Sequence, residues 1–289
     1  MTLPLIWPAP AKLNLMLHIT GRRPDGYHEL QTVFQFLDYG DELRFEPRAD
    51  NEVRRISDVA DVPPGQDLMV RAARALQQAA GCQQGVDIYI DKKLPMGGGL
   101  GGGSSDAATT LHALNKIWAC NLSDEMLADI GLKLGADVPV FIHGFSAFAE
   151  GIGERLTPIE LAEPWYLVIT PDVHVSTASI FNDLELTRDC PAIKICGLSE
   201  SVWDNVCLPV VVRHYPEVAR ALEMLGRYAE ARMSGTGASV FATFETEAEA
   251  IRVRDSLRNS GDVLIPETWK NFIARGVNRS PLQVQLSNY

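Results

Sequence analysis

Six of the seven residues from Gly97 to Gly103 are glycine, and Ser104, Ser105 and Asp106 follow directly. Glycine loses more backbone entropy on folding than any other residue, so such a run is unfavourable as a mere turn. A run of glycines is expected where the backbone must approach a ligand closely. Free N–H groups that lead into the start of a helix form a cradle for anions, and the helix dipole favours the anion further. The loop is therefore predicted to bind phosphate rather than to act as a flexible linker.

Two common nucleotide motifs fit this loop poorly. Gly98 and Gly103 have the spacing of a P-loop, but Ser104 stands where that motif requires lysine. A dinucleotide-binding fold would lead an apolar strand directly into the first glycine, whereas the charged segment 91–93 and Pro95 intervene here. A dinucleotide-dependent oxidoreductase is thus a disfavoured alternative, and a different kind of phosphate site is expected.

Three further motifs are weak when each is taken alone. Lys12 and Asn14 lie opposite the leucines of a strand pattern at 13–19, which is typical of a solvated face. Asp137, in LGADVPVF, is predicted to lie in a turn before an apolar strand. Residues 234–239 (SGTGAS) form a second short Gly/Ser segment, which alone indicates a plain loop.

The periodicity of apolar residues predicts the elements that carry these motifs. Alternation predicts strands at 13–19, 31–36, 42–46, 86–90, 165–170 and 240–244, with a hairpin at Gly40-Asp41. Helical spacing predicts helices at 67–79, 105–118 and 177–182. Three more helices are predicted: one that begins after the N-cap Ser123, one that contains Val218, Leu222 and Leu225, and one that begins at the capping box Thr246/Glu249. Helices and strands do not alternate strictly, so the fold class is α+β. A boundary after Glu163 divides the chain into domains 1–163 and 164–289.

Composition narrows the function classes. The net charge is −11, from 26 basic and 37 acidic residues, which disfavours nucleic acid and anionic membranes as partners. Five irregularly spaced cysteines indicate reduced thiols. The first residues lack the pattern of a signal peptide, and no apolar run approaches a membrane span. The protein is expected in the cytoplasm or, alternatively, in an organelle matrix. We expect it to act on a small molecule and to be a monomer or weak homodimer.

Taken together and in this order, the motifs resemble the GHMP kinase superfamily, which includes galactokinase, homoserine kinase and mevalonate kinase. The segment PAKLN at 10–14, the glycine loop PMGGGLGGGSS at 95–105 and the late SGTGAS loop match its three motifs. GRRPDGYH at 21–28 and the doubled glycine block resemble one branch, whose substrate is a cytidine-diphosphate-linked polyol of isoprenoid biosynthesis. The resemblance covers nearly the whole chain. It implies an N-terminal domain like ribosomal protein S5 domain 2, a ferredoxin-like C-terminal domain, and ATP and Mg²⁺ as cofactors.

The resemblance also implies roles for individual residues. Lys12 and Asp137 correspond to the catalytic pair, Ser105 is expected to help bind Mg²⁺, and substrate contacts fall on Asn14, Tyr27, His28, Phe34 and Phe181. ATP contacts fall on Lys92, Pro95, Met96, Gly97, Gly98, Gly99, Leu100, Gly101, Gly102, Gly103, Ser104 and Ser105. Tyr27 and Phe181 suit the two faces of a cytosine ring and His28 suits its edge, although Phe181 could equally pack in the core. One departure is Asp67, which stands where the family is expected to have an asparagine that contacts adenosine.

Two other interpretations remain beside the expected phosphorylation of a 2-hydroxyl group. A mevalonate-type or homoserine-type kinase would have no use for Tyr27 and His28 as a nucleobase clamp. A nucleotide-binding regulator without catalysis would be indicated by the loss of Lys12 or Asp137, and both residues are present.

Overall fold

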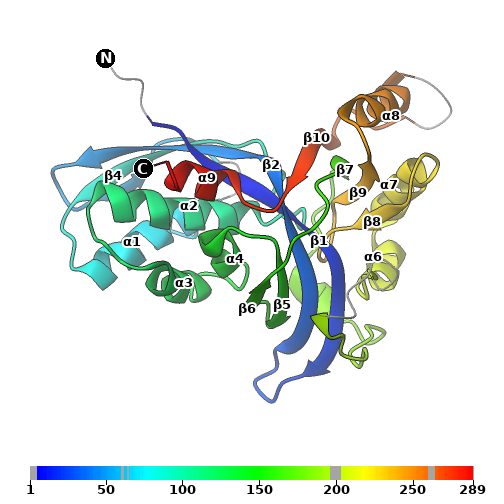
Figure 1. The fold of residues 1–289 in the computed structure, drawn as a ribbon, viewed down its shortest axis with the longest axis horizontal. Coiled ribbons are helices and arrows are strands. Elements are labelled where there is room, and N and C mark those ends of the chain that lie inside the picture. The colour runs from blue at the N-terminus through cyan, green and yellow to red at the C-terminus, as the bar shows by residue number, and fades with distance from the viewer. Residues whose placement is uncertain (1–4, 60–61, 64, 196–202, 260–263, 289) are drawn as a thin grey trace.

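The computed structural model describes residues 5–59, 62–63, 65–195, 203–259 and 264–288. The first half of the chain forms β1 (Trp7–Arg22), β2 (His28–Arg48), β3 (Val53–Arg55), α1 (Leu68–Ala80), β4 (Gly85–Asp91), α2 (Gly102–Ile117), α3 (Asp124–Leu132), α4 (Val138–His143), β5 (Ala147–Gly151) and β6 (Arg155–Pro158). The second half forms β7 (Trp165–Thr170), α5 (Thr177–Asn182), α6 (Leu208–His214), α7 (Pro216–Gly226), β8 (Ala231–Met233), β9 (Val240–Phe244), α8 (Glu247–Asn259), β10 (Lys270–Val277) and α9 (Pro281–Leu286). Figure 1 shows α1–α4 gathered on one side of the molecule and α6–α8 on the other.

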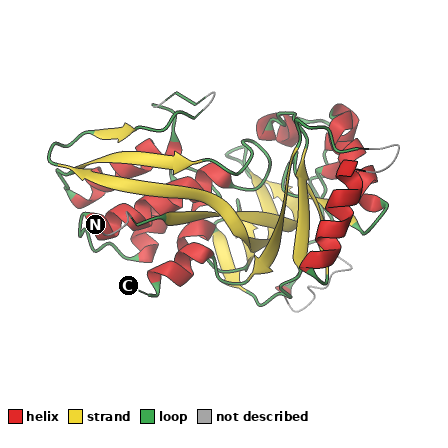
Figure 2. Cartoon of the chain, turned by 90° about the horizontal axis from the view of Figure 1, so that it is seen from above, coloured by secondary structure: helices red, strands yellow, loops and turns green. Residues whose placement is uncertain are grey.

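One continuous sheet runs through both halves, in the order β3-β4-β2-β10-β7-β9-β8. β10 joins the halves, because Gly276 and Val277 pair with β2 while residues 270–275 pair with β7. β1 and β5 also pair with β2, so this long strand is the centre of the first half. Figure 2 shows the strands crossing the molecule with helices at both ends. Among the described strands only β3 and β4 pair in parallel, which confirms the α+β prediction.

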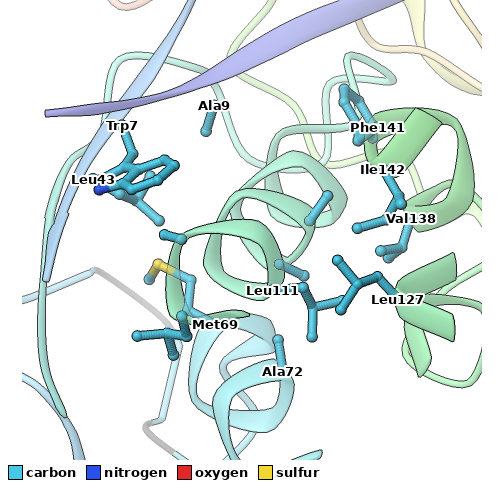
Figure 3. Packing of buried hydrophobic residues seen from close by; sticks show 14 of the residues in the cluster. Trp7, Ala9, Leu43, Met69, Ala72, Leu111, Leu127, Val138, Phe141 and Ile142 are labelled. Atoms are coloured by element: carbon cyan, nitrogen blue, oxygen red, sulfur yellow. The ribbon is translucent and has the colours of Figure 1, made fainter. Parts of the chain in front are cut away.

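The first hydrophobic core lies between the sheet and helices α1–α4. Trp7 of β1, Leu76 of α1, Leu111 of α2 and Phe141 of α4 are all buried in it, and Figure 3 shows several of these packed side chains. Leu282 of α9 belongs to the same core, although it lies near the other end of the sequence. The apolar spacing of α1 and α2 thus holds the start of α2, and with it the end of the glycine loop, against the sheet.

A second core fills the other half. Ile169 of β7, Val211 of α6, Leu225 of α7 and Val240 of β9 are buried there. Leu17 of β1 joins this core, so the strand that carries Lys12 contacts both halves. β1 therefore positions a cationic side chain at the junction between the two cores.

Two predictions about local structure are wrong. Gly40-Asp41 is no hairpin, since β2 runs straight through it, and the hairpin turn lies between β1 and β2 instead. Gly40 pairs with Pro10, and a β-carbon at Gly40 would lie 2.1 Å from the carbonyl oxygen of Ala9. The glycine thus allows a close strand approach, not a turn. The apolar run after Asp137 is helix α4 rather than a strand, because a short apolar run has no period that separates the two.

Most other elements are confirmed. Asp67 caps α1 and Ser123 caps α3, and the strands at 165–170 and 240–244 begin and end as predicted. In the part of the chain that the structure describes, no helix has the length and apolar character needed to cross a membrane. Cys82, Cys120, Cys190 and Cys207 are free thiols, whereas Cys196 lies outside the described residues.

Candidate active site

The glycine loop connects β4 to α2 and uses left-handed backbone at three positions. The φ angles are 66° at Gly97, 75° at Gly99 and 74° at Gly101, a region that other residues rarely adopt. A β-carbon at Gly99 would lie 2.3 Å from the carbonyl oxygen of Ser234, and one at Gly101 would lie 2.6 Å from the ring of Phe141. Glycine is therefore required here by conformation and by space. Gly101 caps α2 without any side-chain hydrogen bond, which leaves the first N–H groups of the helix for a ligand.

The SGTGAS segment supports the glycine loop from the other half of the molecule. The Ser234 hydroxyl donates to the carbonyl oxygen of Gly99 at 2.9 Å and accepts the N–H of Asn14 at 3.0 Å. The N–H of Ser239 donates to the carbonyl oxygen of Gly98 at 3.1 Å. Two loop carbonyls are thus held by donors from the C-terminal half, which fixes the conformation of the loop.

A cavity of about 370 Å³ opens along the loop. Its lining includes all the residues from Pro95 to Ser104, so the predicted ATP contacts lie together, with the exception of Ser105. Outside the loop, the lining of this nucleotide cavity includes five apolar side chains: Val59, Val62, Leu68, Met69 and Ile90. A glycine cradle beside an apolar slot suits a group that carries phosphates at one end and a flat base at the other.

Lys92 lies in this cavity between two carboxylates. Its ammonium group donates to Asp41 and, at 2.8 Å, to Asp106. The other oxygen of Asp41 accepts the N–H groups of Lys93 and Leu94, at 2.6 Å and 2.7 Å. Asp41 therefore anchors the chain just before the glycine loop, while Lys92 ties β2 to the first turns of α2.

Burial shifts the pKa values of Asp106 and Lys92. Burial raises the pKa of Asp106 to about 8, although the Lys92 ammonium opposes the shift. Burial alone would lower the pKa of Lys92, but the two neighbouring carboxylates outweigh it and the pKa is raised. Lys92 thus stays a cation at neutral pH, beside the loop that is expected to hold phosphate.

Asp67 lines the nucleotide cavity and is fully engaged by other groups. Its carboxylate caps α1 by accepting the N–H of Met69 at 2.7 Å, and it accepts from Arg55 at 2.6 Å. Both side chains of the ion pair are 5% exposed. The carboxylate that replaces the expected asparagine is therefore neutralised by a buried arginine of β3.

A second cavity of about 320 Å³ meets the first across the loop. Gly99, Gly101 and Ser104 line both cavities. The second one also contains most of the predicted acceptor and catalytic residues: Lys12, Asn14, Phe34, Asp137 and Phe181. The structure thus brings together three motifs that lie far apart in the sequence, around the junction that Gly99, Gly101 and Ser104 form between the two cavities.

Lys12 and Asp137 form an ion pair in this second cavity, with Nζ and Oδ2 3.3 Å apart. The Lys12 side chain is buried, whereas that of Asp137 is 37% exposed. Lys12 also donates to Asn14 and to the carbonyl oxygen of Gly99, and it lies over the ring of Phe34 at 5.1 Å. The strand residues that resembled a solvated face are in fact buried, because β1 lies between the two cores.

The predicted aromatic clamp is only partly assembled. Tyr27 lies in the β1–β2 turn with its side chain exposed. His28 is buried and stacks on Phe181, with 5.2 Å between ring centroids and 24° between planes. Arg188 donates to His28 at 3.2 Å and to the carbonyl oxygen of Phe181 at 2.9 Å, which fixes this pair. Burial and the positive charges of Arg188 and Arg22 lower the pKa of His28, so its ring is neutral at pH 7.

The two serines after the glycine loop differ in position. Ser104 lines both cavities, whereas Ser105 lines neither. The Ser105 hydroxyl is buried and has no hydrogen-bond partner among the described residues. The contact of Ser105 with a metal ion stays a prediction, and of the two serines only Ser104 lines the junction of the cavities.

Sequence reasoning missed three residues of the site, Asp41, Asp106 and Arg188, and it did not predict the contact that Ser234 of the SGTGAS motif makes. Asp41 and Asp106 hold Lys92, Ser234 holds the loop, and Arg188 orients His28. Asp106 follows the glycine loop directly, and that position was the one available indication. The other contacts join residues 51, 135 and 160 positions apart, so no local pattern could reveal which groups are paired.

Comparison with known proteins gives consistent results. Residues 67–145 match the N-terminal domain of GHMP kinases, and residues 194–263 match the C-terminal domain of GHMP kinases. The chain is therefore a GHMP kinase, a phosphotransferase of a superfamily whose co-substrate is ATP. It is 56% identical to the 4-diphosphocytidyl-2-C-methyl-D-erythritol kinase of Pseudomonas aeruginosa, over 99% of each chain, and 54% identical to that of Shewanella piezotolerans, over 99% of this chain and 98% of the other. It belongs to the 4-diphosphocytidyl-2-C-methyl-D-erythritol kinase family.

Solved structures support the same conclusion. A crystal structure of 4-(cytidine 5′-diphospho)-2C-methyl-D-erythritol kinase superposes with a TM-score of 0.79 at 30% identity, over 94% of this chain and 99% of the other. Homoserine kinase from Cytophaga hutchinsonii superposes with a TM-score of 0.66 at 18% identity, over 95% and 94% of the chains. The second likeness shows the fold alone. Together they confirm the two-domain GHMP kinase fold predicted from the motifs.

Proposed function

We propose that this enzyme transfers the γ-phosphate of ATP to the 2-hydroxyl of 4-diphosphocytidyl-2-C-methyl-D-erythritol. The observation that carries the proposal is the junction of the two cavities at Gly99, Gly101 and Ser104. A nucleotide in the first cavity would direct its terminal phosphate to this junction, and an acceptor in the second would meet it beside Lys12 and Asp137. The identity of the acceptor rests on the relatives, which carry that substrate in their names.

Phosphoryl transfer has a loose, in-line transition state, so catalysis consists mainly of positioning and charge stabilisation. Asp137 is partly exposed in the acceptor cavity, where it can orient the hydroxyl and accept its proton. Lys12 forms an ion pair with Asp137 that fixes the position of the carboxylate, and its ammonium group can also stabilise the transferring phosphoryl group. The N–H groups of the loop and of the first turn of α2 hold the phosphates in line with that hydroxyl.

The protein side chains of this arrangement would supply few ligands to a magnesium ion. The described residues contain no cluster of three or more carboxylate, histidine or cysteine side chains that could hold a metal. The phosphate oxygens would therefore supply most of the ligands, with a hydroxyl from Ser104 or from Ser105, whose buried oxygen is unpaired among the described residues. When bound, Mg²⁺ supplies charge neutralisation on the phosphates.

The acceptor side would hold a cytosine base near the turn between β1 and β2. Tyr27 is exposed and can cover one face of a base without disturbing the fold. Phe181 and His28 stack on each other in the structure. This pair would therefore contact either the second face of the cytosine ring or its edge. Because His28 is neutral and accepts from Arg188 through Nε2, its Nδ1 carries the proton and can donate to a base.

The remaining expectations are part of the same proposal. We propose a division into domains 1–163 and 164–289, which the start of β7 at Trp165 supports, although β10 and α9 return to the first half. We further propose a cytoplasmic enzyme, monomeric or weakly dimeric, without a nucleic-acid partner. The net charge of −11 supports the last point.

A substrate panel tests the proposed function. Release of ADP should be fastest with 4-diphosphocytidyl-2-C-methyl-D-erythritol and near background with mevalonate, homoserine and galactose. The phosphorylated product should show phosphate on the 2-hydroxyl by NMR. Faster turnover of a simpler alcohol would reject the assigned acceptor while leaving the kinase class intact.

A further inference from the structure

Asp106 carries a buried side-chain oxygen that makes no hydrogen bond to the described residues. Oδ2 accepts from Lys92 at 2.8 Å, whereas Oδ1 has no hydrogen-bond partner among the described residues. The residue is 4% exposed and lines the nucleotide cavity. Buried polar atoms without a partner are rare in folded proteins, and one on a residue that lines a ligand cavity points to a group on the ligand.

The position of Asp106 within the cavity limits which group that can be. A β-carbon at Gly103 would lie 3.5 Å from Leu68 of the apolar slot, and one at Gly102 would lie 3.1 Å from the Lys92 ammonium. Asp106 follows these glycines by three and four residues, so it lies on the same side of α2. It is thus placed where the glycine cradle gives way to the apolar walls, which corresponds to the middle of a bound nucleotide.

The chemistry of a nucleotide singles out the ribose. Phosphate oxygens carry negative charge and offer no hydrogen to a carboxylate, and the flat base belongs with the apolar walls. A ribose hydroxyl can both donate and accept, so it can pair with Oδ1 in either protonation state of Asp106. We propose that Asp106 reads the ribose of ATP, with Oδ1 in a hydrogen bond to a ribose hydroxyl. This inference rests on the proposed use of ATP in the first cavity.

Asp41 provides a matched comparison within the same group. It also pairs with Lys92, but its side chain is completely buried and does not line the cavity. Asp41→Asn removes one negative charge beside Lys92 and keeps an oxygen for the N–H groups of Lys93 and Leu94. Any effect that comes from the Lys92 environment alone should therefore appear in both Asp41→Asn and Asp106→Ala.

Calorimetric binding of nucleotides in the absence of acceptor tests the proposal. At pH 9, where Asp106 is ionised in spite of its raised pKa, wild type should bind one of 2′-deoxy-ATP and 3′-deoxy-ATP roughly 10- to 100-fold more weakly than ATP, as expected for a hydrogen bond to a charged group. Asp106→Ala should bind ATP about as weakly as wild type binds that analogue and should no longer distinguish the two. Asp41→Asn should keep the preference for the ribose, even if its overall affinity changes.

A second variant guards against a folding defect in Asp106→Ala. Asp106→Asn has one amide oxygen, which Lys92 requires, so an N–H₂ group faces the cavity and forms a weaker neutral bond. Its preference for ATP over the deoxy analogue should fall to roughly 3- to 10-fold. Equal affinity of wild type for all three nucleotides, or an unchanged preference in Asp106→Asn, would overturn the proposal.

The outcome separates this inference from the proposed function. If the preference for the ribose holds but no phosphate reaches the expected acceptor, the acceptor assignment fails and the role of Asp106 stands. If turnover is as proposed and wild type ignores the ribose hydroxyls, only the role of Asp106 fails. If ATP does not bind at all, both are rejected.

Discussion

The hydroxyl of Ser234 bridges the two halves of the protein, since it donates to the carbonyl oxygen of Gly99 while it accepts the backbone N–H of Asn14. One side chain from the C-terminal half thus links the glycine loop to the strand that carries Lys12. The relative position of the nucleotide and acceptor cavities depends on this link, because Gly99 lines both of them.

Ser234→Ala removes both hydrogen bonds and should weaken ATP binding roughly 5- to 30-fold, because the loop loses about 1–2 kcal/mol of preorganisation. Calorimetric titration with ATP measures the effect. Ser239→Ala is the matched control, since its bond to Gly98 comes from the backbone and only a contact with Thr170 is lost. Equal losses in both variants would show that the Ser234 bridge has no special role.

Asp137→Ala should lower kcat about 100-fold or more while the affinity for ATP stays nearly unchanged, because general-base or orienting groups contribute at that scale. Asp137 lines only the acceptor cavity and makes no side-chain cap to α4, so the fold should be retained. Steady-state kinetics with each substrate varied in turn separates the two effects. A normal kcat with a raised KM for ATP would contradict the assigned role.

Lys12→Met should also depress kcat strongly, and the double variant with Asp137→Ala should be little worse than either single one. The ion pair acts as one unit, so its effects on the activation free energy should not add. Multiplicative losses of kcat in the double variant would indicate that the two residues act independently.

Gly101→Val should abolish ATP binding. The new β-carbon would lie 2.6 Å from Phe141 and 3.1 Å from Lys12, at a φ of 74° that valine rarely adopts. Gly81→Val controls for backbone strain, because Gly81 has a φ of 64° with no atom within 4 Å of a β-carbon. Both variants should melt at lower temperature, but only Gly101→Val should lose ATP. A folded Gly101→Val protein that binds ATP tightly would refute the cradle.

Tyr27→Ala should raise the KM for the cytidine-linked acceptor roughly 5- to 150-fold, the effect of losing one stacked face, and should leave the KM for ATP unchanged. Because Tyr27 is 60% exposed, the melting temperature should not change. His28→Ala should reduce the discrimination between cytosine and uracil forms of the acceptor, and it should also loosen Phe181. Loss of stability without any change in acceptor KM for Tyr27→Ala would reject the clamp.

The free energy of unfolding should fall as the pH drops below about 6.5, the ordinary pKa of histidine in an unfolded chain. Burial lowers the pKa of His112 in the folded state, so the unfolded chain binds the proton first and gains from it. The stability that neutral His112 provides is therefore present above that pH and is lost below it. Urea unfolding at pH 7 and pH 5 should show a smaller difference for His112→Gln than for wild type. An identical difference would exclude His112 as a source.

Local patterns predicted the elements of the fold where period and caps agreed. Ser123 and the strand at 165–170 are examples, since each is decided by neighbours in the sequence. The hairpin prediction at Gly40-Asp41 was wrong because, in the sequence, a glycine needed for close strand packing cannot be distinguished from a turn glycine. The helix after Asp137 was missed because an apolar run of this length would be buried both as a strand and as a helix.

The site was predictable to the extent that its motifs are contiguous. The glycine loop was predicted from its composition and its place between a strand and a helix, whereas the roles of Lys12 and Asp137 were predicted from the resemblance to a family. What remained hidden were partners brought together by the fold, such as Asp41 for Lys92 and Arg188 for His28. Aspartate and arginine are common throughout the sequence, and only their buried positions in the fold distinguish these two residues from the others.

The packing of α9 sets an order for folding during synthesis. Leu282 enters the core of the first half, and the N–H of Ser280 bonds to the carbonyl oxygen of Gly144 at 2.9 Å. The Gln283 side chain donates to the carbonyl oxygen of Ile142 at 2.7 Å. The core of the first half of the chain thus remains incomplete until residues beyond 280 have left the ribosome. Nascent chains that stall earlier expose an apolar gap beside α4, which makes them natural targets for chaperones and proteases.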